Sequence, residues 1–163
     1  RRVPGYIAVQ LVGAALASLF LQAVVGVSAD FGSNAPAVSI SSGSAFWIEV
    51  VLTLGLVSVI LGTASGAQNV GLLGAFAVGF YVTLAGLWAS PISGASMNPA
   101  RTFGPDLVAG NFTDFWVYLA GPFTGAALAV AASYALRGPG GGPVGSTAAQ
   151  GSLDPEILRP SST

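Results

Sequence analysis

The stretch Ile92–Leu107, "ISGASMNPARTFGPDL", decides the fold because it interrupts a chain that is otherwise strongly apolar. It lies between two long apolar segments and contains small residues, two prolines and an arginine. Asn98 is a good helix N-cap, and Pro99 suits the first helical position, where its missing N–H costs no hydrogen bond. The stretch therefore predicts a helix over 99–108, about 15 Å long at about 1.5 Å per residue.

The composition of the whole chain is typical of a polytopic membrane protein. Of its 163 residues, 53% are hydrophobic and only 7% are charged, whereas a soluble domain has about 25% charged residues. The absence of cysteine excludes disulfides, and the absence of histidine removes the commonest metal ligand. We therefore expect no metal site. The net charge of −1 gives no reason to expect a nucleic-acid partner.

Apolar runs of spanning length occur four times along the chain, since a span takes about 20 residues. They cover approximately 4–27, 45–63, 70–88 and 115–136. The helix over 99–108 reaches only about half of a hydrocarbon core about 30 Å thick, so it is predicted to be re-entrant. The fold class is thus all-α, with four transmembrane helices and one re-entrant half-helix within 1–137. The Gly-, Pro- and Ser-rich remainder, 138–163, is predicted to be a disordered tail.

The arginines predict the orientation of these spans. Arg1 and Arg2 precede the first run, and Arg137 follows the last. An even number of spans puts both ends on one side, which the positive-inside rule makes cytoplasmic. We therefore expect a multi-pass protein of the cell membrane with both termini in the cytoplasm. Arg101 would then enter from the outer face, where an arginine is usually functional or buried in a polar cavity.

The half-helix suits a polar lumen within the membrane. Its N-terminus presents unpaired N–H groups and a positive partial charge. Asn98 can cap the helix with its oxygen and still offer its amide N–H groups. The approach over 92–97 is expected to be extended, and such backbone survives at this depth only against protein or a water-filled cavity. With Arg101, these groups repel cations and admit a neutral, hydrogen-bonding solute. An N-capped surface helix in an outer loop is the alternative.

The stretch "SGASMNPARTFGPDL" resembles the second Asn-Pro-Ala loop of the aquaporin, or major intrinsic protein, family. "VPGYIAVQLVGAALAS" is similar to the family's third span, "FWIEVVLTLGLVSVILGT" to the fourth, "FAVGFYVTLAGLW" to the fifth and "FWVYLAGPFTGAALAVAASY" to the sixth. The resemblance implies a tetrameric channel for water or small neutral solutes, with neither enzymatic activity nor a cofactor. It assigns Asn98, Pro99 and Ala100 to the motif.

The resemblance also implies roles for single residues. Glu49, the only carboxylate in a predicted span, matches a glutamate that accepts hydrogen bonds from the re-entrant backbone and buttresses it. Gly86, Ala95 and Arg101 match three positions of the family's narrow filter. Gly86 and Ala95 are small, which indicates a wider pore than that of a water-only channel. Glycerol-type members resemble Gly86 but carry an aromatic residue in place of Ala95, so the solute stays open. Close helix packing is the alternative for Gly86.

The chain departs from the family in one major respect. The first two spans and the first Asn-Pro-Ala motif have no counterpart in it. "SNAPAVSI", residues 33–40, has the order Asn-Ala-Pro and no apolar half-helix behind it, so we interpret it as an outer-loop coincidence. A non-conducting membrane fragment or structural subunit is therefore the alternative function. A secondary transporter is less favoured, because the spans lack ion-coupling carboxylates.

Glycines inside the spans predict close contacts between helices. Gly121 and Gly125 form a small-xxx-small pattern in the last span. Small residues at this spacing let two helix backbones approach each other within a bilayer. We expect the same of Gly13 in the first span.

Overall fold

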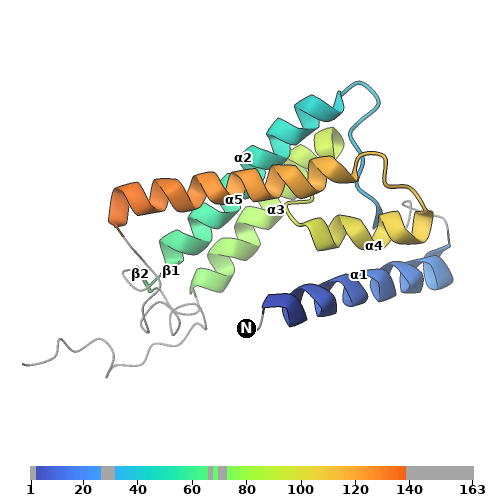
Figure 1. Ribbon diagram of the computed structural model, residues 1–163, viewed down its shortest axis with the longest axis horizontal. Helices are drawn as coiled ribbons and strands as arrows, with labels where there is room; N and C mark the ends of the chain where they lie inside the picture. Colours follow the sequence, from blue (N-terminus) through green and yellow to red (C-terminus); the bar gives the residue numbers. More distant parts are fainter. Residues whose placement is uncertain (1–2, 27–31, 66–67, 70–72, 139–163) are drawn as a thin grey trace, which may run out of the picture.

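The computed structural model describes residues 3–26, 32–65, 68–69 and 73–138 of the chain. It contains the helices α1 (Val3–Val25), α2 (Ser42–Thr63), α3 (Leu73–Ser93), α4 (Pro99–Ala109) and α5 (Phe115–Arg137) (Figure 1). All but α4 are long and apolar enough to cross a membrane, which confirms the predicted fold class. Between α2 and α3, the two-residue strands β1 (Ala64–Ser65) and β2 (Gln68–Asn69) pair antiparallel. Apart from Gly138, the predicted tail lies outside the described residues.

Helix α3 extends further than the sequence indicated. It ends at Ser93 and not near Trp88, and Pro91 lies inside its last turn. A proline there removes one hydrogen bond, but the helix is about to end in any case. The expectation of an extended approach over 92–97 was therefore wrong, since its first two residues are helical. The residues that follow turn sharply, with positive φ at Gly94, Ala95 and Met97.

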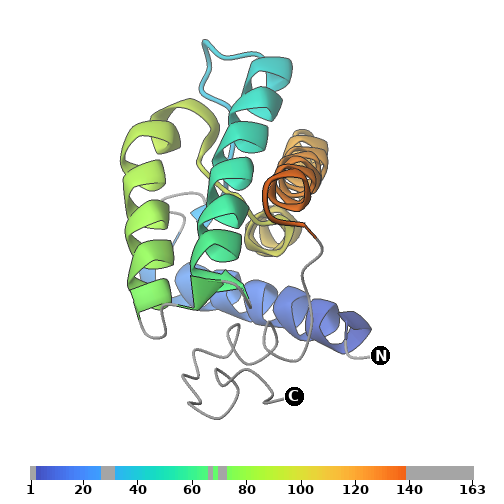
Figure 2. The same cartoon turned by 90° about the vertical axis from the view of Figure 1, so that its left-hand side faces the viewer.

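Helices α2 and α5 form the most extensive contact between elements of the described chain, and α3 stands beside α2 (Figure 2). A Cβ atom on Gly125 would clash with the backbone of Val50, and one on Gly121 would lie 2.8 Å from the Cβ of Glu49. The prediction of close helix contact is confirmed for both glycines. It was wrong for Gly13, where no described atom lies within 4 Å of an added Cβ.

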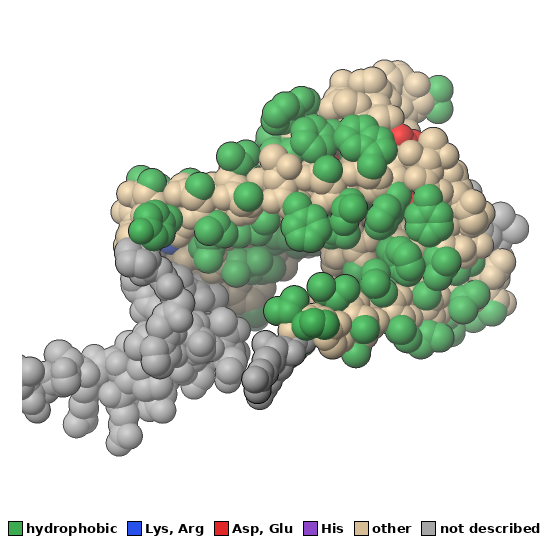
Figure 3. All heavy atoms as spheres, viewed as in Figure 1, with side chains coloured by type: hydrophobic (Ala, Val, Ile, Leu, Met, Phe, Trp, Pro, Cys, Tyr) green, Lys and Arg blue, Asp and Glu red, His purple; other side chains and the backbone are tan. Residues whose placement is uncertain are grey.

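Helix α4 is held between α1 on one side and α5 on the other. A Cβ atom on Gly104 would clash with the backbone of Ala14, so α1 and α4 touch closely there. Elsewhere α1 carries mostly exposed apolar side chains. Figure 3 shows such side chains over the visible face, and an opening between the start of α1 and the body formed by α5. An apolar surface of this extent suits a lipid environment.

Candidate functional site

Helix α4 begins at Asn98. This residue is the N-cap, with φ −152° and ψ 114°, and its Oδ1 accepts a hydrogen bond of 3.0 Å from the N–H of Ala100. Pro99 occupies the first helical position, and the helix has 11 residues. It is therefore about 16 Å long, roughly half the depth of a hydrocarbon core. Asn98 is exposed, and its amide nitrogen has no acceptor among the described residues, so it can donate to a solute.

Glu49 of α2 binds the loop that leads into α4. Its side chain is 0% exposed. Oε1 accepts hydrogen bonds from Ser93 Oγ at 2.8 Å and from the N–H of Ser96 at 3.0 Å, and Oε2 accepts one from the N–H of Met97 at 2.8 Å. Buried N–H groups need hydrogen-bond partners. Because the backbone turns sharply here, the N–H groups of Ser96 and Met97 have no partner within a helix. One carboxylate therefore satisfies three donors of the loop.

Tyr118 of α5 binds Ser93, the last residue of α3, where this loop begins. Its side chain is 0% exposed, and its hydroxyl donates to the carbonyl of Ser93 at 2.6 Å. Ser93 Oγ in turn accepts from the N–H of Ala95 at 3.2 Å. The sequence analysis missed Tyr118. A usable signal existed, because a tyrosine inside an apolar span must find a hydrogen-bond partner for its hydroxyl.

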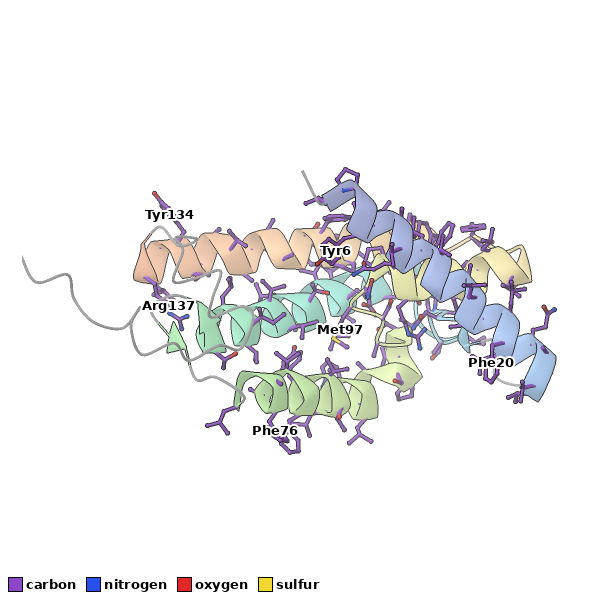
Figure 4. The ribbon with its side chains drawn as sticks, turned by 90° about the horizontal axis from the view of Figure 1, so that it is seen from below. Tyr6, Phe20, Phe76, Met97, Tyr134 and Arg137 are labelled. Carbon is purple, nitrogen blue, oxygen red and sulfur yellow. The ribbon has the colours of Figure 1, made fainter. Side chains whose placement is uncertain are left out.

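The loop between α3 and α4 holds a strained backbone. Ala95 has φ 49° and Met97 has φ 54°, values in the left-handed region that residues with a Cβ rarely adopt. Both side chains belong to a buried cluster between α2 and α3, where Figure 4 shows Met97. The other buried members of this cluster are Leu52, Ala85 and Ala89. Packing and the bonds to Glu49 thus hold a conformation that the loop would not adopt alone.

Arg101 lies in the first turn of α4, three residues after Asn98, and both side chains are exposed. Its Nη1 donates to the carbonyl of Gly32 at 2.8 Å. The positive charge of the guanidinium therefore adds to that of the helix N-terminus. Because Asn98 and Arg101 both belong to the start of α4 and are exposed, this end of the helix offers hydrogen-bond donors and repels cations.

Gly86 stands apart from these residues, on α3. A Cβ atom built on it would have only Ser90 Oγ within 4 Å, at 3.9 Å. Gly86 therefore faces open space within the described structure, and no other described helix packs against it. Ala95 differs, because its side chain is only 9% exposed. The structure thus joins Glu49, Ala95 and the start of α4 in one site, with Gly86 on a separate, open surface.

Asn34 gives the segment 33–40, interpreted above as an outer-loop coincidence, a structural role that the sequence analysis did not foresee. It is 5% exposed. Its Nδ2 donates to the carbonyl of Gly94 at 2.7 Å, and its Oδ1 accepts from Thr102 Oγ1 at 3.2 Å. The N–H of Ala37 adds a bond of 3.0 Å to the carbonyl of Ile92. The segment is no second half-helix, but it is fastened to the re-entrant loop. Its partners lie far away in sequence, so no local pattern could have indicated them.

Known proteins resemble most of the chain. The family model described as "Major intrinsic protein" matches residues 1–133. Aquaporin NIP1-3 of Oryza sativa subsp. japonica is 46% identical over 127 residues, 77% of this chain and 44% of that protein. Probable aquaporin NIP4-2 of Arabidopsis thaliana is 44% identical over 126 residues, 76% of this chain and 44% of that protein. The chain thus spans less than half the length of these curated relatives.

Proposed function

The chain belongs to the major intrinsic protein family, and from this premise we propose that its complete gene product is a passive channel for water or small neutral solutes. The observation that carries the proposal is the start of α4, where Asn98 and Arg101 are both exposed at one end of a half-length helix. Polar groups of this kind are strongly disfavoured against lipid. They therefore face a water-filled lumen, whose remaining wall the described residues do not supply.

The electrostatics of this surface favour neutral solutes. The helix N-terminus and Arg101 are both positive, so a cation that gives up part of its hydration shell meets repulsion there. A neutral molecule with an oxygen atom can accept from the amide of Asn98 or from the guanidinium. Glu49 acts as the buttress that keeps the strained loop, and hence these donors, in place.

The filter of this channel consists of Gly86, Ala95 and Arg101 in the proposal, together with residues outside the described chain. Gly86 supports it because nothing fills the space beside it. The small residue at 86, with open space beside it, favours a lumen wide enough for a hydroxylated solute larger than water. The tetramer and the cytoplasmic termini are part of the same proposal. Arg1, Arg2 and Arg137 support that orientation.

Arg101→Val in the complete gene product tests the channel assignment. The substitution removes a fixed charge and its donors together, so proton flux into proteoliposomes should rise while solute flux is kept or increased. Arg137→Val is the matched control, because Arg137 also donates to a backbone carbonyl, that of Leu61 at 3.0 Å, but at the end of α5. It should leave both fluxes unchanged. If the unaltered protein conducts no faster than empty liposomes, the proposal fails.

A non-conducting structural role is the second candidate, and the open face beside α4 favours it for residues 1–163 taken alone. One half-helix lines only about half of the bilayer depth. Proteoliposomes that contain residues 1–163 as a monomer should therefore shrink in an osmotic gradient no faster than empty ones. Rapid shrinkage caused by a species shown to be monomeric would mean that the face needs no further wall.

A further inference from the structure

We propose that Asn34 is a positioning residue that holds Arg101 at the filter through the segment 32–40. The proposal rests on the proposed function in one respect, since Arg101 must be the charge that faces the lumen. It adds a residue outside the re-entrant loop to those that set selectivity. The segment 32–40 precedes α2 and lies outside every helix that lines the site.

Asn34 connects the turn at Gly94 to the first turn of α4 through two hydrogen bonds. Its amide nitrogen binds the carbonyl of Gly94, the residue before Ala95, and its amide oxygen binds the hydroxyl of Thr102, the residue after Arg101. A single side chain therefore fixes the distance between the turn and the first helical turn of α4. Because both ends of a nearly buried amide are bonded, the side chain has no other low-energy orientation.

The packing around Asn34 is as specific as its hydrogen bonds. A Cβ atom on Gly94 would lie 2.7 Å from Nδ2, 3.1 Å from Cβ and 3.2 Å from Cα of Asn34. Only glycine fits there, and it has φ 85°. The hydroxyl of Thr102, 0% exposed, lies 2.6 Å from Ser96 Oγ. Since the N–H of Ser96 bonds to Glu49, Asn34 is connected to the buttress as well.

Arg101 depends on this attachment. The carbonyl that accepts from its Nη1 belongs to Gly32, two residues before Asn34. The side chain of Arg101 is exposed and long, so a fixed acceptor is needed to confine it. Ser33 Oγ also holds the segment, through a longer bond of 3.3 Å to Asp106 Oδ1. Without the two hydrogen bonds of Asn34, the position of the Gly32 carbonyl is less well fixed. The guanidinium of Arg101, which binds this carbonyl, then becomes mobile.

Chemical modification of Arg101 tests the positioning without any need for conduction. The probe is phenylglyoxal, and peptide mass mapping measures the rate at Arg101 in the complete gene product. Asn34→Ala should raise this rate on the order of ten-fold, the factor expected when one hydrogen bond to a charged group is lost. Asn111→Ala is the control, because Asn111 is exposed and its side chain bonds only to Thr113 among the described residues. An unchanged rate in Asn34→Ala would overturn the proposal.

Selectivity is the second readout, and a purely structural role would not change it. Asn34→Ala should raise the ratio of proton to water permeability in proteoliposomes, whereas a loss of folded protein would lower both fluxes at a constant ratio. A constant ratio would overturn the inference while the channel proposal stands. If the unaltered protein does not conduct, the channel proposal fails, and the modification rate still decides whether Asn34 positions Arg101.

If Asn34→Ala does not fold, a pair of substitutions at Thr102 decides the same question. Thr102→Val keeps the shape but removes the donor to Asn34, whereas Thr102→Ser keeps the hydroxyl. The valine variant should show the faster modification of Arg101 and the higher proton-to-water ratio, and the serine variant should match the unaltered protein. Equal behaviour of the two variants would contradict the proposal.

Discussion

Glycines lie both in the tight contact between α2 and α5 and on the open faces of α1 and α3. The space around them differs between these two regions. In the contact, a Cβ on Gly121 or Gly125 would meet atoms of α2 at once. On the open faces, Gly13 has no described atom within 4 Å of an added Cβ, and Gly86 has one side-chain oxygen. The same residue type therefore lets two backbones meet in one region and leaves space free in the other.

The polar groups of the two regions differ in the same way. On the scaffold side, Glu49 and Tyr118 are fully buried, and each bonds to the loop. On the open side, Asn98 and Arg101 are exposed and have donors to spare. The fully bonded side chains of Glu49 and Tyr118 thus hold the loop in place, and the loop positions the free donors of Asn98 and Arg101. The substitutions below test this division between support and working surface.

Glu49→Leu should have the largest effect, because it removes the support outright. Leucine leaves three buried donors without a partner, at roughly 1–3 kcal/mol for each group. Glu49→Gln keeps an acceptor and should lose much less. The measurement is the free energy of unfolding of the complete gene product in mixed micelles. Equal stability of the two variants would refute the buttress role of Glu49.

Gly125→Ala and Gly86→Ala compare the two regions directly. The first forces a methyl group against the backbone of Val50 and should cost about 1–3 kcal/mol of unfolding free energy. The second adds the same group where there is space, and alanine is the better helix former by about 1 kcal/mol, so stability should be kept or slightly increased. A similar loss in both variants would mean that Gly86 is packed after all.

Gly86→Leu tests whether the open space beside Gly86 is lumen. A larger side chain there should narrow the passage, so glycerol permeability should fall on the order of ten-fold, which corresponds to a barrier higher by about 1.4 kcal/mol. Water permeability should fall less, because water is smaller. The stability of the variant should be unchanged, which separates a blocked passage from a damaged fold. If glycerol and water fluxes are both unaltered, Gly86 lies outside the filter.

The sequence predicted those parts of the site that depend on local chemistry. Asn98 followed by Pro99 predicted the start of α4, because capping and a fixed proline φ act over one turn. The end of α3 was misplaced, since Pro91 can lie in a final turn that the pattern cannot distinguish from a loop. Gly13 and Gly121 look alike in sequence, and only the arrangement of helices separates a packed glycine from an open one.

The long-range bonds were beyond the reach of the sequence. Asn34 lies in a loop of small and polar residues, and its two partners follow it by 60 and 68 positions. Tyr118 likewise bonds to a carbonyl 25 residues earlier in the chain. The position of Glu49 was expected from a resemblance and not from spacing. Its three bonds depend on the turns at 94–97, whose left-handed backbone no helix or strand pattern predicts.

Ala95→Gly should have the smallest effect, and it measures the strain that the support maintains. Glycine removes the cost of a left-handed φ, about 1–2 kcal/mol. It also loses a buried methyl group worth about 0.8 kcal/mol. The unfolded chain gains conformational freedom, which lowers stability by about 0.4–1 kcal/mol. These changes nearly cancel, so stability should stay within about 0.5 kcal/mol.

Ala89→Gly is the matched control, because Ala89 is buried in the same cluster but lies within helix α3. It gains nothing from glycine and should lose about 1–2 kcal/mol. Equal losses at both positions would mean that the turn at Ala95 carries no strain for Glu49 to hold.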